Sequence, residues 1–521
     1  MSRIFNTAGP CVPKNHYMID AQRRLGNEVG SLIQNAQYFV IHAARQTGKT
    51  TLLTALTDQV NDEGKYYALY CSVENAQGIS DPEKGVPSVI NALRESLDSA
   101  GLPAASSFAC DNDGFDYSTI LQRSFRKYCS QLDKPLVVFF DEADCLSDQT
   151  LISFLRQLRS GYVNRARYPF VHSLGLIGMR NIRDYRDRYR SPDETLGSVS
   201  PFNIIASAMT LRNFTRDEIA ELYTQHTEET GQVFEDSAVE SVWLWTQGQP
   251  WLVNAIAREI VENKLKNESL PLVTVSMVNA AVQSIITRRD THLDSLMARL
   301  KEERIRRVIE PVITGDTDKL QRLSDDYIYT KDMGLIRDDR GKVEPANQIY
   351  AEIIVRSLNW DTQQSIVERG YPYQMPRYLR DGVIDMDYLL KDFQAFWREN
   401  AAIWHEVYDY KEAAPHLVLQ AFLQRVINGG GQIHREMAAE TRRVDLCVEY
   451  MRHRYPIELK LRYGDGTRAD GIKQLAAYMD IQGCDTGWLI IFDRRKTISW
   501  DDKLYFDIEI IDKKTILIVG C

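Results

Sequence analysis

Residues 38–51 read Tyr38-Phe39-Val40-Ile41-His42-Ala43-Ala44-Arg45-Gln46-Thr47-Gly48-Lys49-Thr50-Thr51. The first five residues are aromatic, β-branched or histidine, which is typical of a short buried strand. A tight loop follows, and the helical periodicity that continues beyond it indicates a helix. A loop that joins a strand to a helix N-terminus presents backbone N–H groups to phosphate. The stretch therefore predicts an α/β fold with a parallel sheet and a nucleotide phosphate site at this loop.

The loop follows the Walker A pattern, G-x-x-x-x-G-K-T, except that Ala43 replaces the first glycine. Alanine does not readily adopt a strongly positive φ, so we expect the start of the loop to differ from the usual form. Lys49 is expected to reach the β- and γ-phosphates of ATP. The Thr50 hydroxyl is expected to bind Mg²⁺.

A second apolar run, residues 134–140, ends in Asp141-Glu142-Ala143-Asp144. A buried strand that ends in two acids is typical of a Walker B motif. Asp141 would orient Mg²⁺ through its water shell, and Glu142 would act as the catalytic residue that polarises the attacking water. The same four letters also occur in DEAD-box helicases. A second motor-like half with arginine motifs is not evident in the sequence, so the helicase motor is only an alternative.

A third apolar run, residues 171–179, ends at Arg180-Asn181. A polar residue at this point can sense the γ-phosphate in related ATPases. The arginines between 180 and 190 could supply a finger or a nucleic-acid contact, but Asp184 and Arg188 also form an i,i+4 pair of an ordinary solvated helix. The predicted nucleotide-binding residues are Ala43, Arg45, Gln46, Thr47, Gly48, Lys49, Thr50, Thr51, Asp141 and Asn181.

Two further signals follow the third run. Thr215 is expected to cap a helix, with Glu218 completing a capping box, and residues 246–250 read Thr-Gln-Gly-Gln-Pro. Together with the motifs above, these residues resemble the AAA+/STAND-type ATPases of the archaeal-ATPase-like group. The resemblance implies a P-loop ATPase core over residues 1–200 and a helical lid over 201–290. It also implies ATP and Mg²⁺ as ligands and a homo-oligomer in which a neighbour's arginine completes the site.

The middle of the chain reads as a helix closed by Gly334 and then a hairpin around 338–341. This resembles a winged helix, which we expect over residues 291–365. Its helix carries Asp325, Asp326 and Asp332 against Lys331, whereas a DNA-reading helix needs basic and amide side chains. We therefore expect a structural or protein-contact role. Residues 366–410 are expected to form a helical connector.

From residue 411 the pattern changes to an amphipathic helix followed by strands. Asp445 is expected at the end of one strand, and Glu458-Leu459-Lys460 on the next, with Gln474 and Tyr478 on one face of the following helix. This order of elements resembles a PD-(D/E)xK nuclease, which implies an α/β restriction-endonuclease-like domain over residues 411–521. The proline that usually precedes the first acid is Val444 here, a departure from the pattern.

The chemistry of these residues suits cleavage of a phosphodiester. Asp445 and Glu458, with the main-chain carbonyl of Leu459, are the predicted metal ligands, because Mg²⁺ takes few protein carboxylates and keeps its waters. Lys460 is expected to position the attacking water and stabilise the negative charge. Gln474 is the remaining predicted catalytic residue. Residues 421–470 carry nine Lys and Arg against seven Asp and Glu, as a phosphate-tracking groove requires.

The 521 residues and 44% apolar composition are ordinary for a globular protein with several domains. The net charge of −9 argues against a broad nucleic-acid coat. The eight cysteines form no CxxC pair, which favours reduced thiols, and the chain begins without an apolar h-region. We therefore expect a cytoplasmic protein with no membrane partner.

The sequence thus predicts an ATPase whose last domain cleaves nucleic acid, with DNA favoured, under nucleotide control. Kinship with similar fusions suggests a setting in prokaryotic defence or on mobile elements. Two alternatives remain. One is a STAND-like switch whose last domain binds nucleic acid or protein without cutting, and the other is a helicase-type motor.

Overall fold

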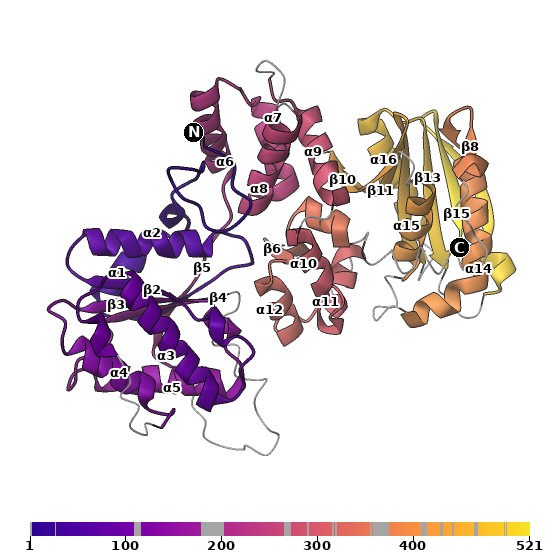
Figure 1. Cartoon of the computed structure of the whole chain (residues 1–521). Coiled ribbons are helices and arrows are strands. Elements are labelled where there is room, and N and C mark those ends of the chain that lie inside the picture. Colours follow the sequence, from indigo (N-terminus) through magenta and orange to yellow (C-terminus); the bar gives the residue numbers. More distant parts are fainter. Residues whose placement is uncertain are drawn as a thin grey trace. The chain divides into compact units, whose positions relative to one another are not determined.

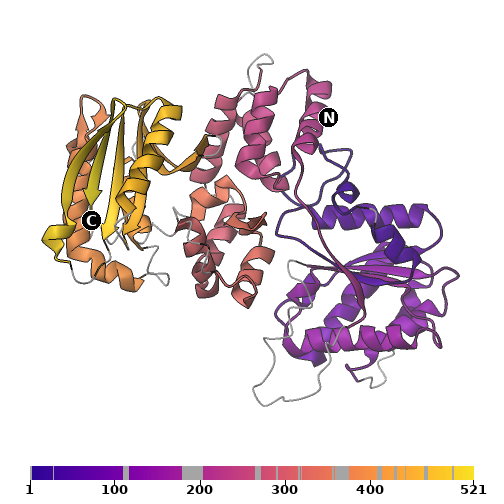
Figure 2. The same ribbon diagram turned by 180° about the vertical axis from the view of Figure 1, so that it is seen from behind.

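The chain forms two compact units in the computed structural model. The first unit comprises Met1–Ser295 and Gln321–Tyr350, and the second comprises Leu296–Leu320 and Ala351–Cys521 (Figures 1 and 2). None of the described helices is long and apolar enough to cross a lipid bilayer. The structure describes residues 3–26, 28–108, 116–178, 203–264, 272–288, 291–314, 317, 320–354, 357, 375–407, 414–427, 431–439, 442–462, 467–493, 495 and 498–521.

A five-stranded sheet forms the centre of the first unit, with strand order β2-β3-β4-β1-β5. All four pairings are parallel, and β1 has the bounds that the sequence predicts. Parallel sheets are covered on both faces, which explains the continuous apolar runs of β1, β3 and β4. The strands are β1 Tyr38–His42, β2 Tyr67–Ser72, β3 Leu136–Asp141, β4 Ser173–Gly178 and β5 Ile205–Thr210.

Helices cover both faces of this sheet (Figures 1 and 2). One apolar core joins α1 and α2 to the face that presents Phe39 and Ile41. A larger core joins α3, α4 and α5 to the face that presents Val40 and Val138. The parallel sheet and its two helical layers match a P-loop ATPase fold. The helices are α1 Glu28–Gln34, α2 Lys49–Asp62, α3 Pro82–Ser99, α4 Ile120–Cys129 and α5 Asp148–Asn164.

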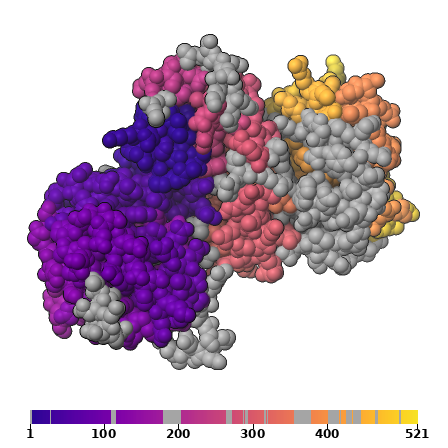
Figure 3. Space-filling view, in the orientation of Figure 1, coloured from indigo at the N-terminus to yellow at the C-terminus, as the bar shows by residue number. Residues whose placement is uncertain are grey.

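A group of helices follows β5. The predicted capping box is confirmed: the Thr215 hydroxyl accepts from the Glu218 N–H while the Glu218 side chain accepts from the Thr215 N–H. The N-terminal residues, indigo in Figure 3, pack against these helices, and Arg3 forms an ion pair with Glu229 at 3.1 Å. The elements are α6 Arg216–Thr230, α7 Asp236–Thr246, α8 Pro250–Arg258, a π-helical turn Glu259–Lys264 and α9 Val275–Arg288.

The helix and hairpin predicted around residue 334 are present and belong to the first unit. Ser324 caps α12, and Gly334 adopts a φ of +73° after the helix, as the sequence predicts. The name winged helix stays a prediction for this segment. The elements are α12 Asp325–Asp332, β6 Ile336–Asp339 and β7 Lys342–Pro345; the preceding helices are α10 Thr291–Arg299 and α11 Glu303–Thr314.

The second unit contains a six-stranded mixed sheet in the order β10-β11-β12-β13-β15-β14. The pairs β12–β13 and β13–β15 are parallel and the other three pairs are antiparallel. The strands are β10 Gly431–Ala439, β11 Arg442–Tyr450, β12 His453–Arg462, β13 Thr486–Asp493, β14 Tyr505–Ile511 and β15 Lys514–Gly520.

Helices again cover two faces of this sheet. A core that includes Phe393, Trp397 and Phe422 joins α14 and α15 to one face, and a smaller core joins α16 to the other. The helix α14 lies within the range expected as a connector, yet it packs into this core. The helices are α14 Met386–Val407, α15 Ala414–Ile427, α16 Thr467–Gln482 and α17 Trp500–Lys503; a short hairpin, β8 Leu379–Arg380 and β9 Val383–Ile384, precedes α14.

Candidate functional site

The phosphate loop runs from the end of β1 to the first turn of α2. Gln46 and Gly48 have φ angles of +56° and +87°, and the Thr47 hydroxyl donates to the Ala44 carbonyl at 2.8 Å. A Cβ at position 48 would lie 3.3 Å from an Nη atom of the buried Arg24. The left-handed backbone and this close neighbour both require glycine at position 48. Ala43 is buried, and no positive φ is needed there.

Lys49 is held at the loop by main-chain oxygens. Its Nζ donates to the carbonyls of Ala43 and Ala44 at 2.9 and 2.8 Å. Burial lowers the pKa of Lys49, and the nearby carboxylates of Asp144 and Asp141 oppose that shift. Phosphate oxygens would compete with the two carbonyls for the ammonium, so Lys49 can turn to a nucleotide without leaving the loop.

Asp141 at the end of β3 is fixed by three donors. Its Oδ2 accepts from the Thr50 hydroxyl at 2.8 Å and from the Tyr70 hydroxyl at 3.1 Å, and its Oδ1 accepts from the Glu142 N–H at 3.0 Å. The side chain is almost fully buried, with 2% of the residue exposed. Thr50 and Asp141, which were each predicted to act on Mg²⁺, are therefore in direct contact. Both offer oxygen ligands of the type that Mg²⁺ prefers, and their roles at a metal ion stay predictions.

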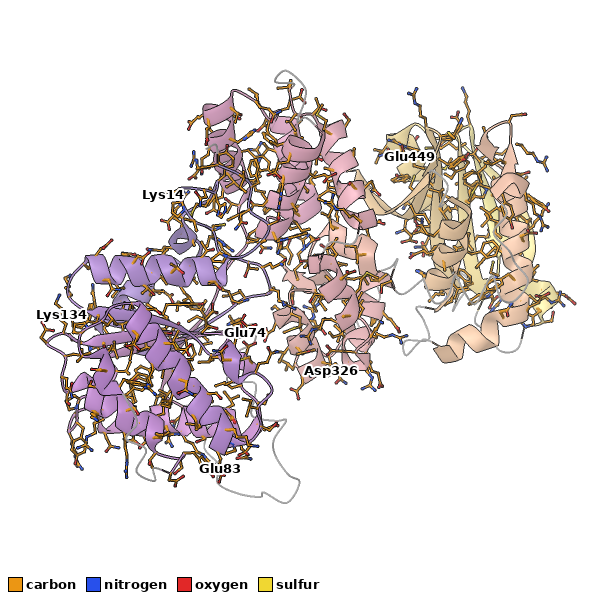
Figure 4. All side chains as sticks on the ribbon, viewed as in Figure 1. Lys14, Glu74, Glu83, Lys134, Asp326 and Glu449 are labelled. Atoms are coloured by element: carbon orange, nitrogen blue, oxygen red, sulfur yellow. The ribbon has the colours of Figure 1, made fainter. Side chains whose placement is uncertain are left out.

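Glu142 directly follows Asp141 and occupies the left-handed region at φ +57°. Backbone strain of this kind recurs at functional sites. Burial, and then the charges of Glu74, Asp141 and Asp144, raise the pKa of Glu142, while Lys49 opposes the rise. Glu74 follows the end of β2 and is labelled in Figure 4. A carboxylate with a raised pKa is a stronger base, which suits the predicted role in activating water.

Two further residues touch the loop. The Gln249 amide, in the Thr-Gln-Gly-Gln-Pro turn that the sequence singled out, donates to the Gln46 carbonyl at 3.4 Å. The Cys11 N–H donates to the Thr51 hydroxyl at 2.9 Å; this contact was not predicted, because no local pattern links residues so far apart in sequence. The predicted residue Arg45 donates to Ser295 at 2.8 Å. Arg180 and Asn181 lie outside the described residues.

Gly334 lies against the phosphate loop. A Cβ at this position would lie 2.4 Å from the Ala44 Cβ. Three residues further on, Arg337 donates a hydrogen bond to the side chain of Gln247, in the predicted Thr-Gln-Gly-Gln-Pro turn, and to Glu344 at 3.0 Å. The segment after α12 therefore contacts both the phosphate loop and this turn.

A second candidate site, formed by Asp445, Glu458 and Lys460, lies where the pairing of β11 and β12 ends. The β11–β12 ladder includes Leu446 and Ile457 and does not continue to Asp445. The prediction that Asp445 ends a strand was wrong, because residues 442–444 extend β11 by pairing with β10. Asp445 Oδ2 accepts the Leu459 N–H at 2.8 Å, so the carboxylate of one strand satisfies the backbone of the next.

Glu458 and Lys460 are neighbours on one face of β12. Lys460 Nζ donates to Glu458 Oε1 at 2.8 Å. Glu458 is 2% exposed, and its Oε2 is buried with no hydrogen-bond partner among the described residues. Burial, and then the charge of Asp445, raise the pKa of Glu458 to about 7. A buried carboxylate oxygen without a partner beside a second carboxylate is suited to a cation.

The donors at this second site are few. In the part of the chain that the structure describes, no group of three or more His, Cys, Asp or Glu side chains is arranged to hold a metal ion. A cation here would therefore depend on Asp445, Glu458 and water, a set of few carboxylates and several waters of the kind that Mg²⁺ accepts. The predicted role of the Leu459 carbonyl stays a prediction.

The two predicted residues of α16 differ in their surroundings. Tyr478 is buried in the core that α16 forms with the sheet, together with Cys447, whereas Gln474 is exposed. The catalytic role of Gln474 stays a prediction. Gly471 was not predicted: a Cβ there would lie 2.6 Å from Leu489 Cδ1 and 3.2 Å from Lys460 Cγ. This glycine lets α16 approach β12 beside Lys460.

Known proteins resemble the first two thirds of the chain. The AAA-like domain family matches residues 17–355. The chain is similar in structure to the Walker-type ATPase PABY2304 of Pyrococcus abyssi, at 14% identity and a TM-score of 0.45, over 67% of this chain and 99% of that one. It is also similar to Cdc6p of Pyrobaculum aerophilum, at 11% identity and a TM-score of 0.37, over 64% and 91% of the two chains. No curated protein matches the sequence.

A further similar structure is the Orc1 protein of Aeropyrum pernix in complex with DNA, at 15% identity and a TM-score of 0.34, over 69% of this chain and 94% of that one. The family match spans more than half of the 521 residues and includes Lys49, Thr50 and Asp141. The chain therefore belongs to the AAA-like domain family and has a P-loop ATPase core.

Proposed function

We propose that the first unit binds and hydrolyses ATP with Mg²⁺ and that the second unit cleaves nucleic acid, with DNA favoured, under the control of that nucleotide. The observation that carries the nuclease half is the buried Glu458 oxygen without a partner, beside Asp445 and Lys460. A purely structural carboxylate would be expected to have both oxygens bonded or solvated.

In the first unit, the loop N–H groups and Lys49 would hold the phosphates. The Thr50 hydroxyl and the Asp141 carboxylate would hold the metal ion, which when bound neutralises charge on the β- and γ-phosphates. Glu142 would accept a proton from the attacking water, and its raised pKa makes it a better base for that step. The predicted roles of Arg45, Gln46 and Thr51 are to shape the loop around the phosphates.

In the second unit, Asp445 and Glu458 would hold the metal ion, which when bound acts as a Lewis acid toward the scissile phosphate. Lys460 now pairs with Glu458. Once that carboxylate turns to a cation, the ammonium would orient the attacking water and stabilise the charge that develops on the phosphate. Arg462 lies two residues beyond Lys460 on β12 and pairs with Asp493 at 4.0 Å, and the phosphate of an anionic substrate would compete with that carboxylate for the guanidinium.

The test is a DNA-cleavage assay with Mg²⁺ on the wild type and on Asp445→Asn. Glu449→Gln is the matched control, because Glu449 is an acid four residues further along the same strand, where it pairs with Arg454 at 3.9 Å and is not one of the predicted metal ligands. We expect Asp445→Asn to abolish cleavage and Glu449→Gln to leave it unchanged. Cleavage that persists in Asp445→Asn would reject this site.

A second candidate is a nucleotide-dependent switch whose last domain binds nucleic acid or protein without cutting. The contact of Gly334 with Ala44 favours this switch, because a movement of the phosphate loop would displace the segment after α12. Under this alternative, DNA or a protein partner would bind in an ATP-dependent way and no phosphodiester would be cleaved.

A further inference from the structure

Tyr70 contacts Asp141 from the neighbouring strand. Its hydroxyl lies 3.1 Å from Asp141 Oδ2, the same oxygen that accepts from Thr50 at 2.8 Å. In the parallel β2–β3 ladder, Ser72 is directly opposite Asp141 and Tyr70 is opposite Phe139. Tyr70 therefore reaches Asp141 diagonally, over a distance that requires a long side chain.

The Tyr70 ring is itself held in place. It packs against the core that α1 and α2 form with the sheet, and this packing restricts the position of the hydroxyl. Thr50 belongs to the nucleotide loop, and its hydroxyl is also the expected metal ligand. Among the described residues, two side chains donate to Asp141 Oδ2, those of Thr50 and Tyr70, and Tyr70 is the one that lies outside the nucleotide loop.

We propose that Tyr70 is a positioning residue of the ATPase site: its hydroxyl fixes Asp141 Oδ2, and the affinity of the nucleotide complex for Mg²⁺ depends on that bond. The proposal rests on the proposed binding of ATP by this unit and adds a residue outside the Walker motifs. A preorganised ligand binds a cation more tightly, because less ordering accompanies binding.

The experiment measures ADP binding by calorimetry while Mg²⁺ is varied, with EDTA as the metal-free reference. Tyr70→Phe removes only the hydroxyl. We expect it to leave the affinity for ADP in EDTA unchanged. The Mg²⁺ concentration at which the enhancement of ADP affinity is half-maximal should rise by about 10-fold, which is the effect of losing one hydrogen bond to a charged group. Equal Mg²⁺ dependence in the variant and the wild type would overturn the proposal.

Tyr67→Phe is the matched control. Tyr67 lies on the same strand, and its hydroxyl donates to a different aspartate, Asp133, at 2.9 Å. We expect this variant to match the wild type at every Mg²⁺ concentration. A shift in Tyr67→Phe as large as that in Tyr70→Phe would indicate a general effect of loosening β2 and would overturn the proposed role.

A double-mutant cycle tests whether Tyr70 acts through Asp141. In an Asp141→Asn background, Tyr70→Phe should add no further change in Mg²⁺ dependence, and an equal change in both backgrounds would contradict the proposal. The quantity measured is the difference in melting temperature between the protein with ADP and Mg²⁺ and the same protein with ADP alone. A general loss of stability therefore cancels within each variant. If the wild type binds no ADP in any condition, the proposed ATPase function fails instead.

Discussion

The backbone N–H of Leu459 donates to Asp445 Oδ2 at 2.8 Å. This bond joins the two strands at the point where their ladder ends, and it fixes Asp445 beside Glu458. The charge of Asp445 in turn contributes to the raised pKa of Glu458. The two acids of the candidate nuclease site are therefore coupled before any ligand binds.

This coupling predicts a pH-dependent cost in stability. The folded-state pKa of Glu458, about 7, is above the usual 4.5, so the folded protein favours the neutral form. The contribution of the neutral Glu458 carboxyl to the free energy of unfolding is fully present below pH 4.5. It is lost as pH rises through about 7, because the buried carboxylate then becomes charged. In metal-free buffer, Glu458→Gln should be more stable than the wild type at pH 8, by at most about 3 kcal/mol, and similar to it at pH 5. Urea unfolding at the two pH values measures the difference, and equal differences would contradict the assigned environment.

Gly471→Ala should destabilise the second unit. The added methyl group would meet Leu489 Cδ1 at 2.6 Å and Lys460 Cγ at 3.2 Å, so α16 or Lys460 must move, at a cost of about 1–3 kcal/mol. Gly30→Ala is the control, because Gly30 is also helical and has open space around it. It should be neutral or stabilising by about 1 kcal/mol. Equal effects of the two substitutions on the melting temperature would show that α16 does not pack closely at Gly471.

Gly334→Ala should cost more stability than Gly341→Ala. Both glycines have positive φ angles, +73° and +85°, so backbone strain is similar. The difference between the two variants, expected at about 1–2 kcal/mol, reports the contact of residue 334 with Ala44. Ala44→Gly should restore part of the loss in a double variant, as measured by denaturant unfolding. Without any such rescue, the contact between residue 334 and the phosphate loop could not account for the cost.

Glu142→Gln should lower ATP turnover by about 100-fold or more while ADP still binds, because it removes the proposed base and keeps the shape of the site. Glu83→Gln is the control: Glu83 is an exposed acid in the first turn of α3, labelled in Figure 4. Its turnover should stay within about twofold of the wild type. Phosphate release measures turnover and calorimetry measures ADP binding. If the turnover of Glu142→Gln is unchanged, Glu142 is not the residue that accepts the proton from the attacking water.

The local features of both sites could be predicted from sequence. The strand Tyr38–His42, the capping box of Thr215 and Glu218, and the turn at Gly334 depend on neighbouring residues, and the structure confirms them. Asp445, Glu458 and Lys460 could also be grouped, because an acid on one strand and alternate residues on the next share one face of a sheet.

Contacts that depend on strand order or helix packing could not be predicted. Tyr70 reaches Asp141 only because β2 and β3 are adjacent, and Gly471 matters only because α16 lies over β12. The amphipathic patterns of residues 366–410 indicated a helical connector, but an amphipathic pattern does not say which core a helix joins. The prediction therefore did not include the packing of α14 against the second sheet.

We propose that a nucleotide in the first unit controls cutting by the second. The most direct measurement is the initial rate of plasmid nicking in Mg²⁺, with and without ATP, for the wild type and Lys49→Ala. We predict that ATP changes the rate of the wild type, and that Lys49→Ala cuts at the ATP-free rate in both conditions. The absence of nicking by the wild type under every nucleotide condition would contradict the account, as would an equal response to ATP in Lys49→Ala.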